Sequence, residues 1–97
     1  MTTRRRLKKE IDYVISDLVL DCMTYSNLYN KPNDEDTIRI IQDTMSMRNR
    51  LREQVNHPEQ KDNAQTKKSY YNQIARTLME GVNDGYGKLG KLIEKDK

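Results

Sequence analysis

The spacing of apolar residues in the first third of the chain constrains its fold most. Between residues 3 and 29, apolar side chains recur every three or four positions, which is the period of an α-helix. The main series is Leu7, Ile11, Val14, Leu18, Cys22, Tyr25 and Tyr29, and a parallel series is Ile15, Val19 and Met23. A stripe of this width is typical of a helix that packs against a core. We therefore predict a helix over about 3–29.

The same period recurs twice more along the chain. Pro32 disfavours helix at the residue before it, and a second helix is predicted over about 34–56. Its apolar series is Ile38, Ile41, Met45, Leu51 and Val55, with Ile40 and Met47 beside the main line and Arg48 at an apolar position. Residues 57–62 read as a polar linker. A third helix is predicted over about 63–94, on Tyr71, Ile74, Leu78, Val82, Gly85, Leu89 and Leu92 or Ile93.

These three series indicate an all-α protein that forms one domain over residues 1–97. The chain has only two prolines and four glycines in 97 residues, so it is poor in the residues that make frequent turns. The short connection between the first two helices favours antiparallel neighbours. We therefore expect a bundle of three long antiparallel helices.

The segment GYGKLG, residues 85–90, has the G-x-G-x-x-G spacing of a dinucleotide-binding turn. Such a turn joins a strand to a helix, and the pyrophosphate lies at the start of that helix. Here the preceding residues have the helical period and only seven residues follow. The glycine-rich kinase loop fails likewise, since no strands flank it, and a P-loop would need glycine at Val82. We expect no nucleotide cofactor.

The glycines allow two interpretations, because each one destabilises a helix interior by roughly 0.8–1 kcal/mol relative to alanine. Either the helix is continuous, and Gly81 and Gly85 on its apolar face admit a neighbouring backbone, or the helix stops at Asn83-Asp84-Gly85. The unbroken apolar period favours the continuous helix. A helix of this length outruns the other two, so its apolar end should overhang and meet a second copy. The residues expected at this homodimer interface are Gly81, Gly85, Leu89, Leu92 and Ile93.

Charge is distributed unevenly along the chain. Residues 1–10 carry a net charge of +4, and residues 11–37 carry −5. Clustered bases are typical of phosphate contact with DNA, RNA or an anionic membrane surface, although a solvated helix end has the same composition. The candidate phosphate contacts are Arg4, Arg5, Arg6, Lys8, Lys9, Arg48, Arg50 and Arg52. Lys67 and Lys68 beside Tyr70 and Tyr71 form one further aromatic and basic pair, which is a weak signal of single-strand binding.

No constellation in the sequence indicates catalysis or a metal. Asp17 and Asp21 are one helical turn apart but have no Glu-x-x-His partner. His57 is the only histidine, and Cys22 lies on an apolar series, so neither has a catalytic pairing. Tyr13 and Tyr70 are expected to face outward, where tyrosine suits a partner surface.

The function expected from the sequence is therefore non-enzymatic. We expect a small intracellular helical module for protein interaction or scaffolding that acts as a homodimer, with itself or another protein as partner. The alternative is a nucleic-acid-associated accessory protein that uses the basic N-terminus. No stretch approaches 18 consecutive apolar residues, so no membrane span is expected, and the expected location is cytoplasmic.

Overall fold

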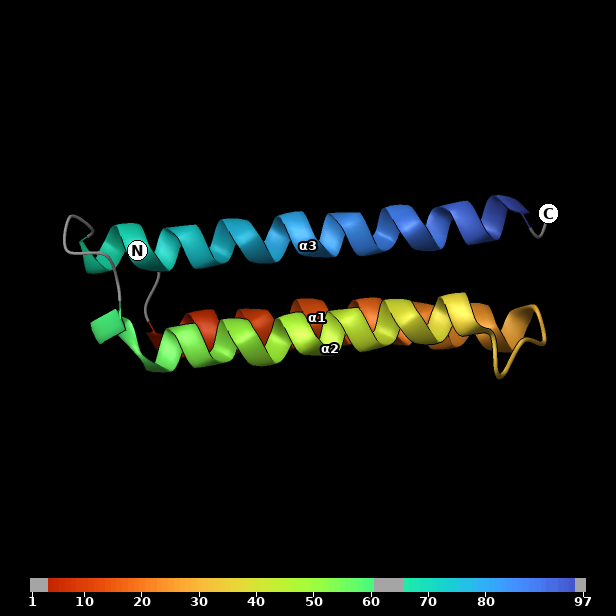
Figure 1. Ribbon diagram of the computed structural model, residues 1–97, viewed down its shortest axis with the longest axis horizontal. Helices are drawn as coiled ribbons and strands as arrows, with labels where there is room; N and C mark the ends of the chain where they lie inside the picture. The colour runs from red at the N-terminus through yellow and green to blue at the C-terminus, as the bar shows by residue number, and fades with distance from the viewer. Residues whose placement is uncertain (1–3, 61–65, 96–97) are drawn as a thin grey trace.

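The computed structural model describes residues 4–60 and 66–95, and this part of the chain consists of helices without strands. α1 spans Arg4–Leu28, α2 spans Glu35–Asn56 and α3 spans Lys67–Lys95, and a single 3₁₀ turn, η1, covers Pro58–Gln60. α1 and α3 run in the same direction and α2 runs opposite to both (Figure 1). All three helices pack against one another along a bundle of 48 × 21 × 18 Å. The all-α helical bundle is thus confirmed.

The helix ends follow from local hydrogen bonds. After α1, Asn30 has a φ of 53°, and the amide of Lys31 donates to the carbonyl of Ser26 at 2.8 Å. This left-handed cap ends α1 one residue before the predicted limit and turns the chain toward α2. The carboxylate of Asp34 then accepts from the amide of Thr37 at 3.0 Å and caps α2.

The start of the third helix differs from the prediction. Thr66 is not helical, and its hydroxyl accepts from the amide of Ser69 at 3.1 Å, so it acts as the N-terminal cap. α3 therefore begins at Lys67 rather than near residue 63. The predicted helical residues 3 and 63–65, and the linker residues 61 and 62, lie outside the described part of the chain.

The core lies along the contact of the three helices and has two parts. Residues of all three helices form the larger cluster: Leu7, Ile11, Ile15, Met47, Leu51, Val55, Tyr71, Ile74, Leu78 and Val82. The smaller cluster lies toward the α1–α2 turn and consists of Leu18, Cys22, Tyr25, Ile40 and Leu89. On α1, Ile15 is fully buried and Val14 only partly. Ile15 therefore belongs to the main core series and Val14 to the parallel series, the reverse of the prediction.

The predicted core face of α2 is wrong over its first half. The buried series is Thr37, Ile40, Thr44, Met47, Leu51 and Val55, and Ile38 and Met45 are exposed. Both series have helical spacing, and they differ by one position. Threonine can occupy the core here because its hydroxyl finds a partner: that of Thr44 donates to the carbonyl of Ile40 at 2.6 Å. A prediction from apolar residues alone therefore places the core face of α2 one position away from the observed face.

α3 runs through all four glycines without a break, so the continuous helix is confirmed. None of these glycines has a positive φ. A Cβ on Gly81 would overlap the thioether of Met47, and a Cβ on Gly85 would lie 2.6 Å from a methyl of Leu18. The missing side chains of Gly81 and Gly85 therefore make room for side chains of α2 and α1 within the same chain.

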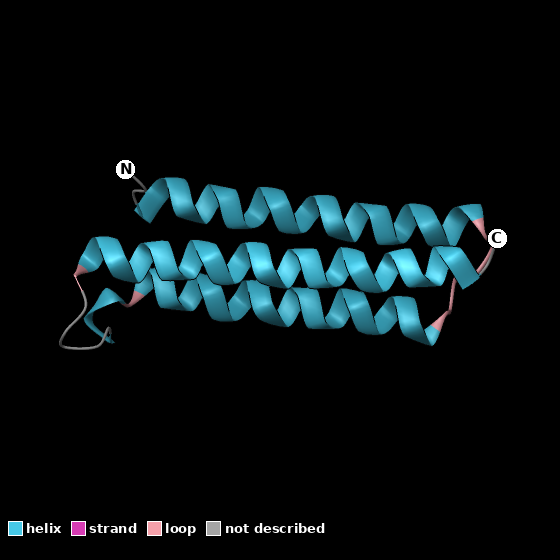
Figure 2. Ribbon diagram, turned by 90° about the horizontal axis from the view of Figure 1, so that it is seen from above, coloured by secondary structure: helices cyan, strands magenta, loops and turns pink. Residues whose placement is uncertain are grey.

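The expected overhang of α3 is wrong. The C-terminal end of α3 lies beside the α1–α2 turn in two perpendicular views (Figures 1 and 2). Leu89 is only 4% exposed, and Leu92 and Ile93 are partly buried against the smaller core cluster. The added length of α3 covers the turn of its own chain, so the overhang gives no reason for a second copy. The assignment of these residues to an oligomer interface stays a prediction.

Candidate functional site

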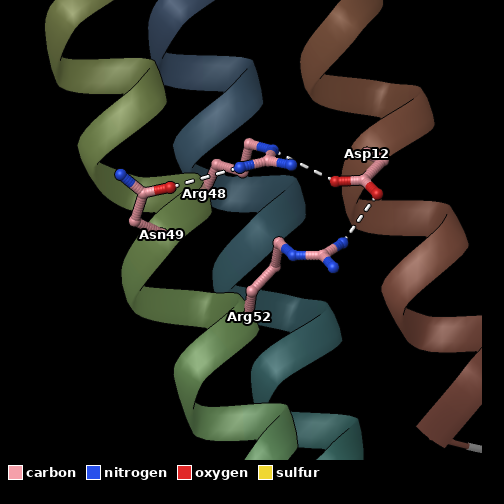
Figure 3. A network of polar contacts seen from close by, with 4 residues as sticks. All are labelled: Asp12, Arg48, Asn49 and Arg52. Carbon is pink, nitrogen blue, oxygen red and sulfur yellow. Dashed lines mark hydrogen bonds and ion pairs between the residues drawn. The ribbon is translucent and has the colours of Figure 1, made fainter.

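One face of the α1–α2 pair points away from α3, and an ion-pair network lies on it (Figure 3). Both oxygens of Asp12 on α1 accept from arginines of α2: Oδ1 from Nε of Arg48 at 3.1 Å and Oδ2 from Nη1 of Arg52 at 2.6 Å. Arg48 also donates to Oδ1 of Asn49 at 3.2 Å. Two of the predicted phosphate contacts, Arg48 and Arg52, are thus already paired with a carboxylate.

The ion pairs show which residues of the two helices lie opposite each other. Because α1 and α2 are antiparallel, the residues that follow Asp12 on this face of α1 lie opposite those that precede Arg48 on α2. At helical spacing these positions are occupied by apolar side chains from both helices. We call this surface the apolar seam, and it consists of Val19, Leu20 and Met23 of α1 and Ile38, Ile41 and Met45 of α2.

Four of the six side chains of the apolar seam are substantially exposed, whereas Val19 and Ile41 are partly buried against the core clusters. Leu20 and Met23 are 58% and 52% exposed, and Ile38 and Met45 are 40% and 38% exposed. A pair of packed helices has two faces, and α3 covers only one of them. Near Asp12 the other face is filled by ion pairs, whereas further along it carries aliphatic side chains that no described part of the chain covers. Exposed apolar side chains that gather in this way are typical of an interaction surface.

A second feature is the end of the bundle where α1 begins, α2 ends and α3 begins. Nη2 of Arg4 donates to Oδ1 of Asn56 at 3.3 Å, which joins the start of α1 to the end of α2. The hydroxyl of Tyr70 donates to the carbonyl of Gln54 at 2.9 Å, which joins the start of α3 to α2. The fold therefore brings two predicted basic groups, residues 4–9 and 48–52, to the same end.

Cutting the bundle at the middle of its helices shows how strongly charge separates. In the described residues, the half formed by 4–16, 46–60 and 66–81 holds eleven Lys and Arg and five Asp and Glu, a net charge of +6. The half formed by 17–45 and 82–95 holds five Lys and Arg and eight Asp and Glu, a net charge of −3. We call the first half the basic end. A molecule so divided has an oriented electrostatic field along its length.

α3 adds to the basic end a hollow that the sequence reading missed. It has a volume of about 410 Å³, and the described residues that line it are Thr66, Lys68, Ser69, Asn72, Gln73 and Arg76. Each of these six side chains carries a hydrogen-bond donor, and none is a carboxylate. From the sequence, Lys68 is a candidate only as part of the aromatic and basic pair, and Arg76 is not a candidate. The signal that could have found them is the parallel direction of α1 and α3, which puts their first turns together.

The exposure of the tyrosines agrees only in part with the prediction from the sequence. Tyr13 is 75% exposed, as expected, but Tyr70 is half-buried with its hydroxyl bound to α2, and Tyr71 is buried. The predicted aromatic and basic pair therefore presents no free ring on which bases could stack. Tyr86 of α3 donates its hydroxyl to Oδ2 of Asp21 on α1 at 2.8 Å. Burial, and then this carboxylate, raise the pKa of Tyr86 to about 12.

The surroundings of Cys22, His57 and the acidic side chains determine what chemistry these described residues can support. Burial, and to a lesser degree the charge of Asp21, raise the pKa of the Cys22 thiol, which keeps it protonated and poorly nucleophilic. Nδ1 of His57 lies 2.9 Å from Oε1 of Glu59 in the exposed η1 turn. Among residues 4–60 and 66–95, no three side chains of the types His, Cys, Asp and Glu are grouped as metal ligands. Within the same residues no helix has the length and apolar character needed to span a bilayer.

Comparison with known proteins gives no match: no family model fits the chain, and no curated protein and no solved structure is significantly similar to it. The apolar seam and the basic end, which includes the α3 hollow, are therefore the two surfaces from which a function is argued.

Proposed function

We propose that this protein is a non-enzymatic protein-interaction or scaffold module whose working unit is a homodimer. The apolar seam is the observation that carries this proposal. Four of its side chains are between 38% and 58% exposed, on the one broad face of α1 and α2 that α3 leaves open. In this proposal the seams of two copies face each other. The α1–α2 pair of one copy then stacks on the α1–α2 pair of the other, and the four helices form the centre of the dimer.

Self-association suits the shape of this face. A two-fold axis through the seam brings the same patch of both copies together, which is the commonest arrangement in homodimers. A stable interface buries roughly 800 Å² on each partner. A bundle face of 48 × 21 Å offers enough area for such an interface. The apolar seam supplies its centre, and the polar side chains around it supply the rim.

Charge favours one orientation of the two copies. With the two-fold axis perpendicular to the long axis, the two basic ends, each at +6, lie at opposite ends of the dimer. The parallel arrangement would instead place the two +6 ends together, at a cost in repulsion. Separation of the basic ends therefore supports an antiparallel dimer. The interface differs from the one expected from the sequence, because Gly81, Gly85 and Leu89 are packed within their own chain.

The decisive experiment is light scattering on the full chain at low and high salt. A homodimer has a mass of about 23 kDa, twice the 11.5 kDa of one chain. Because burial of apolar side chains provides most of the association energy, the dimer should persist at high salt. A mass of 11.5 kDa at every concentration would contradict the proposed dimer.

Paired variants locate the interface. Met23→Glu together with Met45→Glu places charges in the apolar seam and should produce a monomer, since unpaired buried carboxylates are costly. Met79→Glu is the matched control, because Met79 is a methionine of similar exposure, 45%, on α3, which lies on the other side of the molecule. This control should remain dimeric. If it dissociates to the same degree, the seam is not the interface.

A further inference from the structure

We infer that the basic end binds the phosphate backbone of duplex nucleic acid, with its centre at the α3 hollow lined by Thr66, Lys68, Ser69, Asn72, Gln73 and Arg76. This function is separate from the proposed dimer, because the hollow and the apolar seam belong to different helices. It assigns a ligand class to the exposed bases of that end.

The first support is convergence of charge. Eleven of the sixteen Lys and Arg in the described residues lie in the basic end, and they come from all three helices. Bringing cations together in this way raises the free energy of the folded chain through repulsion. Arg48 and Arg52 are paired with the carboxylate of Asp12, whereas Arg4 donates to the neutral side chain of Asn56. Lys9, Arg50, Lys67, Lys68 and Arg76 remain exposed. A polyanion is the ligand that such a field attracts.

The second support is the chemistry of the α3 hollow. Protein contacts to a nucleic-acid backbone come mainly from Arg and Lys, and from Ser, Thr, Asn and Gln side chains. The hollow combines one lysine and one arginine with two hydroxyls and two amides. No carboxylate is among its described lining residues to repel a phosphate, and no aliphatic side chain is there to suit a lipid chain or an apolar peptide. Lys68 and Arg76 are eight residues apart, which on a helix is about 12 Å.

The tyrosines decide between duplex and single-stranded nucleic acid. Sequence-independent binding of single strands relies on aromatic rings that stack on bases. Beside the α3 hollow Tyr71 is 6% exposed and Tyr70 is held by its bond to Gln54, so neither offers an open ring face. The exposed Tyr13 lies on α1, which contributes no described residue to the lining of the hollow. Contacts are then restricted to phosphates and sugars, whose charge density is higher in a duplex. We therefore expect binding to duplexes without sequence preference.

The test is fluorescence anisotropy of the full chain with a labelled DNA duplex of about 21 base pairs, two helical turns. Each neutralised phosphate contributes about −0.9 to the slope of log affinity against log salt. Two contacts, from Lys68 and Arg76, therefore predict at least a roughly tenfold loss of affinity between about 50 and 200 mM salt. The absence of binding by the wild-type chain at low salt would overturn the inference.

A matched pair of variants tests the location. Lys68→Ala with Arg76→Ala should lower affinity at least about tenfold at low salt and reduce the slope by about 1.8. Lys91→Ala with Lys95→Ala removes the same charge from exposed positions of the same helix in the other half, and should change affinity less than about threefold. Equal losses in the two variants would mean that net charge alone drives binding, and would overturn the assignment to the basic end.

Two further measurements keep the outcome unambiguous. Far-ultraviolet circular dichroism should show unchanged helicity in both variants, and Lys68→Gln with Arg76→Gln replaces the alanine pair if it does not. Light scattering of the basic-end variant should give the wild-type mass, which separates this site from the dimer interface. Binding to anionic phosphatidylserine vesicles in the absence of duplex binding would identify a membrane surface as the ligand and overturn the inference.

Discussion

Leu18 of α1 occupies the space that a side chain at position 85 of α3 would fill. A Cβ on Gly85 would lie 2.6 Å from Cδ2 of Leu18, and Leu18 is fully buried. The glycine therefore sets how closely the two helices approach in the smaller core cluster. Leu18 belongs to the same buried cluster as Cys22 and Leu89, so these neighbours have to accommodate a shift of its side chain.

We predict that Gly85→Ala destabilises the protein although alanine is the better helix former. Overpacking of a filled core costs typically 1–3 kcal/mol, and the gain in helix propensity offsets roughly 0.8–1 kcal/mol of it. The free energy of unfolding should fall by up to about 2 kcal/mol in urea denaturation.

Gly87→Ala is the internal comparison for this prediction. A Cβ at Gly87 has no other atom within 4 Å, so only the helix propensity changes. The free energy of unfolding should rise by about 0.8–1 kcal/mol. If both alanine substitutions stabilise the protein, Leu18 can move aside. If both destabilise it, α3 is not a regular helix in this region.

The sequence predicts the three helices because apolar residues recur with the helical period over many turns of each one. It fails on the core face of α2, where Thr37 and Thr44 are buried and Ile38 and Met45 are not. Propensity and hydropathy rank isoleucine above threonine for a core. The choice between two adjacent stripes, however, depends on which face meets α1 and α3. That relation is a property of the assembled bundle, and the pattern of one helix does not contain it.

The candidate surfaces were predictable only in part. Clusters of bases at residues 4–9 and 48–52 are visible in the sequence, and an up-down-up order of helices brings them together with Lys68 and Arg76. The pairing of Arg48 and Arg52 with Asp12 was not foreseen, because both arginines were predicted as phosphate contacts. Asp17 and Asp21 lie further along α1 on a different side of the helix, and only the register of α1 against α2 distinguishes Asp12 from them as a partner of these arginines.

The Asp12 network should make a small, salt-dependent contribution to stability. Asp12→Ala removes both ion pairs and leaves two like charges one helical turn apart on α2. Because Asp12 is 45% exposed, solvent screens these pairs, and we expect the free energy of unfolding to fall by only about 0.5–1 kcal/mol at low salt. The difference should shrink near 1 M salt, where the screening length is about 3 Å.

Asp17→Ala is the control for Asp12, because it removes the same exposed group from the same helix outside the network. Its effect in the same urea denaturation series should be smaller than that of Asp12→Ala at low salt. Equal effects of the two substitutions at every salt concentration would mean that the contribution of Asp12 comes from net charge and not from the two arginines.

The cap of α2 should matter more than its surface position suggests. Oδ2 of Asp34 accepts from both the amide and the hydroxyl of Thr37, at 3.0 and 2.8 Å, and Thr37 is 2% exposed. Asp34→Ala removes the partner of a helix-end amide and of a buried hydroxyl together. The free energy of unfolding should fall by about 1–2 kcal/mol.

Asp34→Asn separates the cap from the charge. The asparagine side chain keeps an oxygen that accepts from Thr37, so thermal or urea unfolding should show a loss well below that of the alanine variant. A loss as large as that of Asp34→Ala would assign the effect to the negative charge at the helix N-terminus rather than to the two hydrogen bonds.

The Tyr86–Asp21 contact should make stability depend on pH in the alkaline range. The pKa of Tyr86 is raised to about 12 in the folded chain by burial and by the Asp21 carboxylate, whereas tyrosine in an unfolded chain titrates near 10. The folded state thus holds this proton more tightly than the unfolded state. The resulting stabilisation is fully present below pH 10 and is lost as the pH rises toward 12.

Tyr86→Phe tests this linkage. The difference in the free energy of unfolding between the wild type and this variant should be constant below a pH of about 10 and should decrease between about 10 and 12. Taking the difference cancels the titration of lysines common to both proteins. Asp21→Asn removes the second cause of the shift and should move the tyrosinate absorbance change of Tyr86 toward lower pH. A difference that does not change with pH over this range would show that Tyr86 titrates in the folded protein as it does in the unfolded chain.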